Sequence, residues 1–526
     1  MTQEKQIRNP TITLYPFHLR EDFDEGFDEK GRLKVAQNAK QLWENLTTVG
    51  EHFDITELKS LRDYLLCYNN GEYNHAVENT QLSDQDLKKP DGKTLRFQSV
   101  PQPDNLTVGG SIYPLRIHDT YAADLTLSYK SITEKEKSEG ITVKVADLSK
   151  FNPQGCLLPD KIQPSIGQTL LLYGEPVNLL DKDYRDFADA CVQRFVQDKV
   201  EQEFKFRKKG RLFGSPIFEY DNGELNPAKR CHIIVWLKRV PETLSKLATT
   251  NFNYYLLKLL CYRSKTIFAY YKSKQLHKEA QILVSKLEKE IPEFEEIEEI
   301  IEAEIRIQRL KNLLARIRAN LFDYTKCLRY LRECHNTVSI NTDNYAEVFA
   351  EIHKLRLEGD NLELWQDFID LSHNKFQSQI QVDLNYLIAN QDLFKEMIDT
   401  IRGMVEILAE EQAQVRDNYE KERDRNLQIN IGAVGVGLGF AGVVVSSSPY
   451  LPLKPPFTSS SFYPFISVLS LSLICGFVSA LLTRVVVMRI LTHRDNKRLH
   501  QSSTPIMGEL TQAKKNNESH RTSQQK

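Results

Sequence analysis

The residues best suited to acid/base chemistry are a histidine and two carboxylates, His118, Asp119 and Asp124. A histidine beside a carboxylate can transfer a proton near neutral pH. The alternation of apolar and polar residues from Tyr113 to Tyr129, however, is typical of ordinary loop and strand-edge residues. The region contains no Walker loop, no HExxH, no GxSxG and no GxGxxG before a helix. We therefore expect no enzymatic activity.

Cysteine and histidine do not form a metal-binding pattern. Cys231-His232 and Cys334-His335 are adjacent pairs, and neighbours in sequence point to different sides of a helix or strand. The eight cysteines contain no CxxC pair, which indicates reduced thiols and argues against a disulfide framework. We predict no cofactor and no resident metal site.

A dense run of glutamates is the strongest charge feature. On a helix it could concentrate cations near a conduction path or hold divalent ions between subunits. The spacing of the apolar residues among them favours a solvated helix face instead. The run excludes an anionic partner such as DNA at that face, and the net charge of −2 gives no indication of nucleic-acid binding. The glutamates are Glu288, Glu290, Glu293, Glu295, Glu296, Glu298, Glu299, Glu302 and Glu304, and the residues expected to point inward are Ile291, Phe294, Ile297, Ile301 and Ile305.

A basic run, Lys205 to Arg211, could contact phosphates or lipid head groups. Such a run is more often the end of a helix, where cations favour the C-terminal dipole. We expect that helix to extend from Tyr184 to Phe206.

A row of glycines follows at steps of three, four and three: Gly432, Gly435, Gly439 and Gly442. In lipid, small residues let helix backbones approach closely, so this face should contact another helix. That helix is either the second apolar segment of the same chain or a copy of the first from another chain. A neighbouring seam, running from Asn426 through Ala433 to Phe440, also needs a partner, which favours a symmetric oligomer.

Asn426, Gln428 and Asn430 lie where this glycine-bearing segment begins. Uncharged polar residues in this place could form a ring at the mouth of a pore. The alternative is that they only mark the end of the segment at the membrane interface.

Two apolar segments without charge could cross a membrane, Leu427 to Val445 and Phe462 to Thr483. Each is about long enough for a ~30 Å hydrocarbon core. Basic residues precede the first and follow the second, whereas the segment between them carries one base, Lys454. By the positive-inside rule we expect both termini in the cytoplasm and the small loop outside. The start, Met1 to Asn9, lacks the apolar core of a signal peptide, in agreement with this topology.

Long helices should lead into the first apolar segment, because no proline occurs between Pro292 and Pro449. We predict helices from Glu242 to Glu290, Glu293 to Cys334, Asn344 to Glu358 and from Asn361 onward, with turns at His335 to Asp343 and at Glu358 to Asn361. The last helix carries a heptad seam interrupted by Gln412, namely Phe394, Ile398, Ile401, Val405, Leu408, Val415 and Tyr419.

The N-terminal part mixes strand and helix patterns without strict alternation, which favours an α+β fold over a doubly wound sheet. The predicted strands are Thr11 to Phe17, Thr94 to Val100, Tyr113 to Ile117, Asp124 to Tyr129, Ile141 to Ala146, Gln168 to Tyr173, Pro216 to Tyr220 and Cys231 to Leu237. The predicted helices are Arg32 to Asn45, Ile55 to Cys67 and Tyr184 to Phe206.

The order of these parts resembles the CorA-type divalent cation transporters, most clearly from Asn361 to Arg498. The Gly-Met-Asn signature that the family carries after its first span is absent, because the loop Ser446 to Ser461 reads as serine and proline and Met507-Gly508 lies in the tail. The resemblance implies a homo-oligomeric funnel, pentameric in that family, whose first spans surround a pore for divalent cations.

We thus expect an integral membrane protein with a cytoplasmic N-terminal α+β domain, a long-helix stalk and a C-terminal two-helix hairpin. The leading hypothesis is a homo-oligomeric ion-conducting or gated pore controlled by the cytoplasmic domain. The alternative is a membrane-anchored regulatory or interaction protein without transport activity. The expected parts are residues 1–240 (α+β domain), 241–426 (helical bundle and stalk), 427–446 (first span), 447–461 (outer loop), 462–483 (second span) and 484–526 (basic end and disordered tail).

Overall fold

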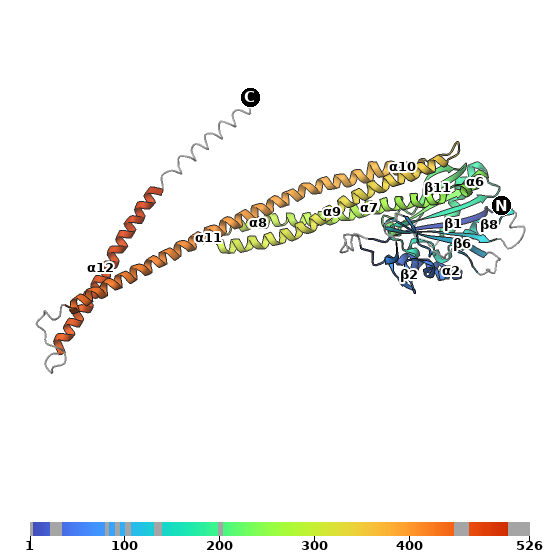
Figure 1. Ribbon diagram of the computed structural model, residues 1–526. Coiled ribbons are helices and arrows are strands. Elements are labelled where there is room, and N and C mark those ends of the chain that lie inside the picture. Colours follow the sequence, from blue (N-terminus) through green and yellow to red (C-terminus); the bar gives the residue numbers. More distant parts are fainter. Residues whose placement is uncertain are drawn as a thin grey trace, which may run out of the picture. The chain divides into compact units, whose positions relative to one another are not determined.

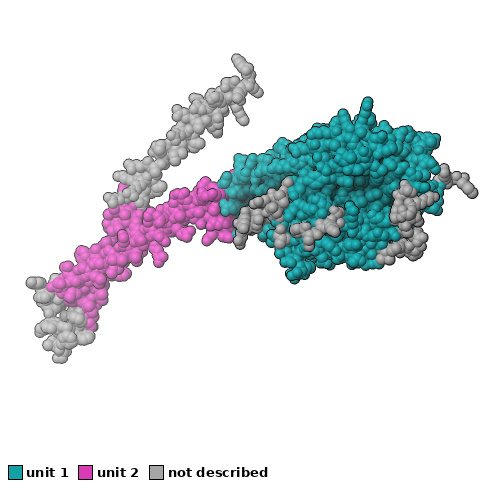
Figure 2. All heavy atoms as spheres, turned by 45° about the vertical axis from the view of Figure 1, so that its right-hand side comes forward, with its two compact units in different colours: residues 1–296, 312–399 teal, residues 297–311, 400–526 magenta. Residues whose placement is uncertain are grey.

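A computed structural model describes residues 4–21, 34–78, 84–89, 95–99, 107–130, 139–197, 203–446 and 462–502 (Figure 1). The expected outer loop, 447–461, and the tail beyond Ser502 lie outside the described residues. The chain divides into two compact units (Figure 2). Unit 1 comprises residues 1–296 and 312–399, and unit 2 comprises residues 297–311 and 400–526.

A ten-stranded sheet in the described residues forms the centre of unit 1, with the order β10-β11-β12-β9-β1-β7-β6-β4, β5 beside β6 and β8 beside β1. All its pairs are antiparallel except β12 with β9. The strands are β1 (Gln6–Leu19), β4 (Asp84–Asp86), β5 (Leu95–Gln98), β6 (Thr107–Ile117), β7 (Thr120–Lys130), β8 (Thr142–Lys144), β9 (Gly167–Pro176), β10 (Lys205–Leu212), β11 (Ser215–Asp221) and β12 (Cys231–Leu237). A separate small hairpin joins β2 (Tyr68–Asn69) and β3 (Glu72–Tyr73).

Helices cover both faces of the sheet. Alternate residues of a strand point to opposite faces, so Ile233 and Val235 of β12 pack into the main core while Trp236 points the other way. On the core face lie α1 (Gln41–Phe53) and α5 (Tyr184–Val196), whose buried residues belong to the same core cluster. On the other face Trp236 meets Phe252 of α7 (Phe252–Glu288), with ring centroids 5.5 Å apart. Every predicted strand lies within or overlaps one of the observed strands.

The shorter elements connect the sheet to its covering helices. They are α2 (Thr56–Lys59), α4 (Pro159–Ile162), α6 (Glu242–Thr249) and the 3-10 turns η2 (Leu61–Tyr64), η3 (His75–Val77), η4 (Val145–Phe151), η5 (Pro153–Gly155), η6 (Asp181–Asp183) and η7 (Pro227–Lys229). The helix predicted from Ile55 to Cys67 is therefore broken into α2 and η2. The helix predicted from Arg32 to Asn45 begins only at Gln41 in the described residues and continues to Phe53.

The prediction that the basic run ends a helix is wrong. Helix α5 ends at Val196, and Lys205 to Arg211 belong to the edge strand β10. The run fits an edge strand. Phe206 pairs with Tyr220 of β11, and the exposed cations Lys205, Arg207 and Lys209 alternate with less exposed residues. Lysine-rich edges are a common means of preventing the pairing of sheets from different molecules.

Long helices follow the sheet: α7, α8 (Glu290–Glu298), α9 (Ala303–Leu355), α10 (Glu363–Leu371), a π-helical turn η8 (Ser372–Gln377), α11 (Ser378–Ser446) and α12 (Phe462–Ser502). The predicted turn at His335 to Asp343 is wrong, because α9 runs through it. Val338 and Thr342 are fully buried there and continue the buried face to Tyr345, while Asn336 and Asp343 are exposed. The break predicted at Glu358 to Asn361 is confirmed, and Gly359 has the left-handed φ of +81°.

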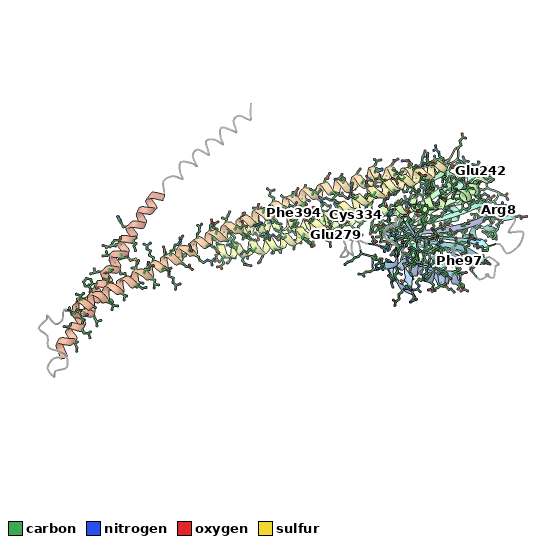
Figure 3. All side chains as sticks on the ribbon, viewed as in Figure 1. Arg8, Phe97, Glu242, Glu279, Cys334 and Phe394 are labelled. Atoms are coloured by element: carbon green, nitrogen blue, oxygen red, sulfur yellow. The ribbon has the colours of Figure 1, made fainter. Side chains whose placement is uncertain are left out.

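In unit 1 the long helices pack against one another. Phe394 of α11 (Figure 3) lies edge-on to Tyr324 of α9, with centroids 6.2 Å apart. The Tyr324 hydroxyl donates a hydrogen bond of 2.6 Å to the carbonyl oxygen of Leu387 on α11. A sheet-rich N-terminal region followed by long helices and an apolar C-terminal helix is thus confirmed.

Candidate functional site

The two apolar helices of unit 2, α11 and α12, touch backbone to backbone. A Cβ atom added to Gly437 would lie 2.7 Å from the carbonyl oxygen of Gly476, and one added to Gly476 would lie 2.9 Å from that of Gly437. The Ser472 hydroxyl donates a hydrogen bond of 2.9 Å to the carbonyl oxygen of Ala441. Ala433, one turn before Gly437, is also buried. Small residues therefore allow a close helix crossing.

The predicted glycine row lies on the opposite side of α11. At about 100° per residue, Gly432, Gly435, Gly439 and Gly442 centre roughly 180° from Gly437 and Ala441. A Cβ atom added to any of these four glycines would meet nothing within 4 Å in the described residues. Within one chain, α12 thus packs against the Gly437 side of α11 and not against the predicted glycine row. A repeat of small residues at steps of four, Ala433-Gly437-Ala441 facing Ser472-Gly476-Ala480, was the available signal.

Asn426, Gln428 and Asn430 are all exposed on α11. By the same helical spacing they do not share one face: Gln428 lies on the side of the glycine row, whereas Asn426 and Asn430 lie on the side of Gly437. If several copies of α11 formed a ring with their glycine sides turned inward, Gln428 would be the only one of these three residues to point into the ring.

Both apolar helices are long and apolar enough to cross a membrane. The best windows have a mean hydropathy of 1.9 in the helical run Glu363–Ser446 and 2.1 in Val468–His493, and 11% of each window is buried. The helices meet this criterion by their length and composition alone. Large side chains on both helices are exposed, among them Leu438, Leu473 and Phe477.

The heptad seam of α11 is buried only in its first part. Phe394, Ile401 and Leu408 are buried, whereas Val415 is 53% exposed and Tyr419 is 70% exposed. The seam therefore continues toward the apolar segment, but in the described residues no other helix buries its second part, Val415 and Tyr419.

The glutamate run is divided among the end of α7, α8, the connector between α8 and α9, and the start of α9. Ile297 is fully buried as predicted, but Ile301 is 97% exposed, so the inward-facing stripe is only partly correct. Within unit 1, Arg316 binds Glu290 at 2.8 Å and also contacts Glu293. The described residues contain no group of three or more His, Cys, Asp or Glu side chains arranged to hold a metal ion.

A joint in unit 1 connects the sheet to the helix that leads into α11. The carboxylate of Asp360 accepts hydrogen bonds of 2.8 Å from the backbone N–H groups of Phe213, Gly214 and Leu357. Next to it, Asn361 and Arg211 exchange two backbone hydrogen bonds. The connector between α9 and α10 is thereby fastened to the turn between β10 and β11.

His118, Asp119 and Asp124 are not brought together for catalysis. His118 and Asp119 form the β6–β7 turn, and Asp119 pairs with the buried Lys265 of α7. Burial alone would raise the pKa of Asp119, but the charge of Lys265 lowers it below 3.8. Asp124 lies on β7, where it accepts a hydrogen bond of 2.8 Å from Thr126, and burial raises its pKa to about 6. His118 and Asp119 thus lie in a turn, as predicted, whereas Asp124 lies within β7, a strand paired with β1 on one side and β6 on the other.

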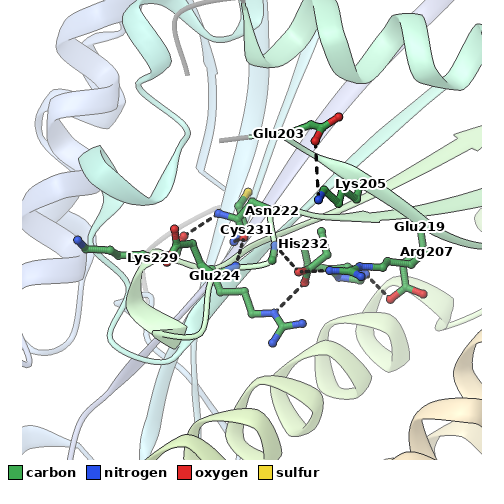
Figure 4. Close-up of polar contacts among 12 residues, drawn as sticks. Glu203, Lys205, Arg207, Glu219, Asn222, Glu224, Lys229, Cys231 and His232 are labelled. Atoms are coloured by element: carbon green, nitrogen blue, oxygen red, sulfur yellow. Dashed lines mark hydrogen bonds and ion pairs between the residues drawn. The ribbon is translucent and has the colours of Figure 1, made fainter. Parts of the chain in front are cut away.

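A chain of buried polar side chains extends over three neighbouring strands on the α7 side of the sheet, and Figure 4 shows two of its members, His232 and Glu219. His232 of β12 lies 3.0 Å from the hydroxyl of Thr169 on β9 and 2.8 Å from the carboxylate of Glu219 on β11. Arg263 of α7 approaches the same carboxylate at 3.4 Å. Burial and the charge of Arg263 lower the pKa of His232 below 6.5, against the effect of Glu219. The protein environment thus favours the neutral form of His232. The adjacent Cys231-His232 pair in the sequence does not indicate this role.

No protein-family model and no curated protein matches the chain. Among solved structures, it is similar to the CorA magnesium transporter from Methanocaldococcus jannaschii, at 10% identity over 60% of this chain and 89% of that chain, with a TM-score of 0.13. A score this low carries no argument, so the proposals below rest on the residues of this chain.

Proposed function

We propose that α11 and α12 span a bilayer as a hairpin, and that copies of the chain assemble through the glycine row into an ion-conducting or gated pore controlled by the sheet-rich domain. The observation that carries this proposal is the pair of opposite small-residue faces on α11. Gly437 packs against Gly476, whereas a Cβ atom on Gly435 or Gly439 would meet no atom of the described residues within 4 Å. In lipid, close packing stabilises helix contacts, so an unfilled glycine row is the feature that a second helix would complete.

The exposed side chains of the two helices support a bilayer as their environment. Leu438 and Phe477 are each 69% exposed. Exposure of apolar surface to water costs about 25 cal/mol per Å², a cost that hydrocarbon surroundings remove. With basic residues before Leu427 and after Thr483, the proposed orientation places both termini in the cytoplasm.

The seam of α11 supports assembly of several copies. Val415 and Tyr419 continue the seam beyond Leu408 but are exposed. By the same helical spacing, Val415 and Tyr419 lie on the side of Gly437, opposite the glycine row. The seam and the row would therefore be covered by different neighbours, which a symmetric homo-oligomer of several copies provides.

Gln428 shares the side of the glycine row, so it would lie beside the contacts between copies at the mouth of such a pore, whereas Asn426 and Asn430 are turned toward the α12 side. Amide oxygens are ligands for hard divalent cations, so a divalent cation is the cargo to test first. The Asp360 joint would transmit movements of the sheet to α11, and we propose no enzymatic role for the sheet-rich domain.

The second candidate function is a membrane-anchored regulatory or interaction protein. The observation that favours it is the contact of Gly437 with Gly476 and of Ser472 with Ala441, because this contact closes the hairpin within one chain. In that case the glycine row faces lipid and no ion passes.

The test is ion flux in liposomes that contain the purified protein and a Mg²⁺-sensitive dye. We expect flux from the native protein and its loss in the double variant Gly435→Leu, Gly439→Leu. The matched control, Val434→Leu, adds bulk at an exposed position about 120° around the helix from the centre of the glycine row and should retain flux. Membrane-inserted native protein without flux would refute the pore and leave the anchor function.

A further inference from the structure

Large apolar side chains remain exposed on the outer surface of two long helices of unit 1. Phe322 of α9 is 73% exposed. On α11, Val382, Tyr386 and Leu393 are 61%, 60% and 55% exposed, and their spacing of four and seven residues places them in one stripe. An apolar stripe on a helix whose other face is already buried indicates a docking surface.

The Phe322 face of α9 and the stripe of α11 lie at the same level of the helical bundle. Two hydrogen bonds between α9 and the helical run that contains α11 show that these helices are antiparallel. In one of them, Thr325 of α9 receives a hydrogen bond of 2.9 Å from Gln391 of α11. Phe322 lies shortly before Thr325 and Leu393 lies shortly after Gln391, so the two exposed side chains stand at nearly the same level.

In one chain the two surfaces cannot meet, because they lie on opposite flanks of α11. At about 100° per residue, Tyr386 and Leu393 lie roughly 140° and 160° around α11 from Gln391, so the stripe faces away from α9. Phe322 lies about 60° around α9 from Thr325, on the flank of α9 next to α11. Two different surfaces at one level of one chain are what a head-to-tail ring requires, because each copy then covers the stripe of the next.

The charges around the two surfaces have opposite signs. Arg318, Lys326 and Arg329 lie four or seven residues from Phe322 on the same face of α9, and all three are exposed. The α11 segment from Asn385 to Asp399 carries three acidic residues and one lysine. A second copy of the chain therefore offers charge complementarity as well as apolar contact.

Lipid does not reach the stripe in the proposed hairpin. Leu393 lies more than 30 residues before Leu427, where the first apolar segment begins, and α11 is helical between them. At 1.5 Å per residue this length of helix corresponds to roughly 50 Å. A cover for the stripe must therefore be protein.

We propose that the Phe322 face of one copy docks on the α11 stripe of the next copy, so that the long helices of unit 1 form a head-to-tail ring. This inference rests on the homo-oligomer proposed above and names the surfaces that join its copies outside the membrane. The symmetry axis of a ring in a membrane is perpendicular to the bilayer, so surfaces at the same level meet. The apolar contact then has an ion pair on one side and a cation–π contact on the other. The facing pairs are Phe322 with Leu393, Arg318 with Glu396 and Arg329 with Tyr386.

Cysteine pairs test this contact in the full-length protein in lipid nanodiscs. The background carries Cys327→Ser and Cys475→Ser, because the other six cysteines are buried. A disulfide forms only between close Cβ atoms, so each pair reports one proposed contact. The test pairs are Phe322→Cys with Leu393→Cys and Arg329→Cys with Tyr386→Cys.

The control pair is Phe322→Cys with Lys395→Cys. Lys395 is exposed at the same level as Leu393 but lies about 160° around α11 from it. The control therefore keeps one half of the contact and moves the other half to the opposite side of the helix.

We expect mild oxidation of each test pair to give a ladder of covalent dimers, trimers and larger products on a non-reducing gel. The ladder forms because every chain carries both halves of the contact, as a head-to-tail ring requires. Phe322→Cys alone, Leu393→Cys alone and the control pair should give no ladder.

The mass of the native protein distinguishes the failure of this contact from the failure of the proposed function. If both test pairs form no disulfide between chains while the native protein is a discrete oligomer, the contact is overturned and the proposed assembly stands. A native monomer would overturn both. Dimers from Leu393→Cys alone would assign the stripe to a symmetric contact between two α11 helices, and disulfides within one chain would place the two surfaces together, so either result would also overturn the proposal.

Discussion

Asp360 contacts the backbone of two elements that are far apart in the sequence. Its carboxylate accepts from Phe213 and Gly214 of the β10–β11 turn as well as from Leu357. Hydrogen bonds to a charged group contribute about 1.5–3 kcal/mol each, and backbone N–H groups left without an acceptor are costly.

We predict that Asp360→Ala destabilises the protein by about 2–4 kcal/mol. The measurement is the unfolding midpoint of the detergent-purified protein, followed by tryptophan fluorescence. The matched control is Asp367→Ala, which removes only an exposed ion pair with Lys208 and should cost less than about 1 kcal/mol. Equal effects of the two substitutions would contradict the role of the joint.

His232 should make the stability of the sheet depend on pH. Its pKa in the folded protein is lowered from 6.5, chiefly by burial. The unfolded chain therefore binds the proton more tightly, so the contribution of His232 is complete above pH 6.5 and decreases as the pH falls below that value.

The prediction is a smaller decrease of the unfolding midpoint between pH 7 and pH 5 in His232→Gln than in the native protein. His18 and His118, whose pKa values burial also lowers, remain in both proteins and provide the common background. Identical pH profiles would show that His232 does not titrate with unfolding.

The sequence allowed part of these residue roles to be predicted. The break from Glu358 to Asn361 could be predicted, because glycine favours the left-handed conformation that ends a helix and aspartate or asparagine favours a cap. The hydrogen bonds of Asp360 to Phe213 and Gly214 could not be predicted, because they depend on where the chain returns to the sheet.

Among the elements, α10 and β10 approach so closely that only glycine fits between them. A Cβ atom on Gly210 would lie 2.8 Å from the carbonyl oxygen of Asn361 and would also collide with Leu364. We predict that Gly210→Val destabilises the protein by about 1–3 kcal/mol, although valine favours strands. Unfolding midpoints provide the measurement, with Lys209→Val at the neighbouring exposed position as control. An unchanged or raised midpoint for Gly210→Val would contradict the contact.

Strand positions were predictable because apolar alternation and turn residues are local signals. The basic strand β10 was not, because lysine and arginine favour helices in isolation and its β-bulge between Phe206 and Lys208 obscures the alternation. The continuity of α9 was missed for a similar reason, since polar residues on its outer face imitate a turn. In each case a contact with another element decided the structure.

For the whole molecule, the order of a sheet-rich region, long helices and apolar helices follows from changes in composition and periodicity along the sequence. The face that joins α11 to α12 did not follow, because Gly437 and the glycine row offer equally small residues on opposite sides of one helix. The membrane topology, the assembly and the cargo stay predictions.

The measurement that tests the central claim most directly is the mass of the full-length protein in detergent or lipid nanodiscs, beside the double variant Gly435→Leu, Gly439→Leu. We predict a discrete homo-oligomer of about four or more chains, weakened by the two substitutions and unchanged by Val434→Leu. A monomer or dimer that is indifferent to all three substitutions would contradict the proposed assembly.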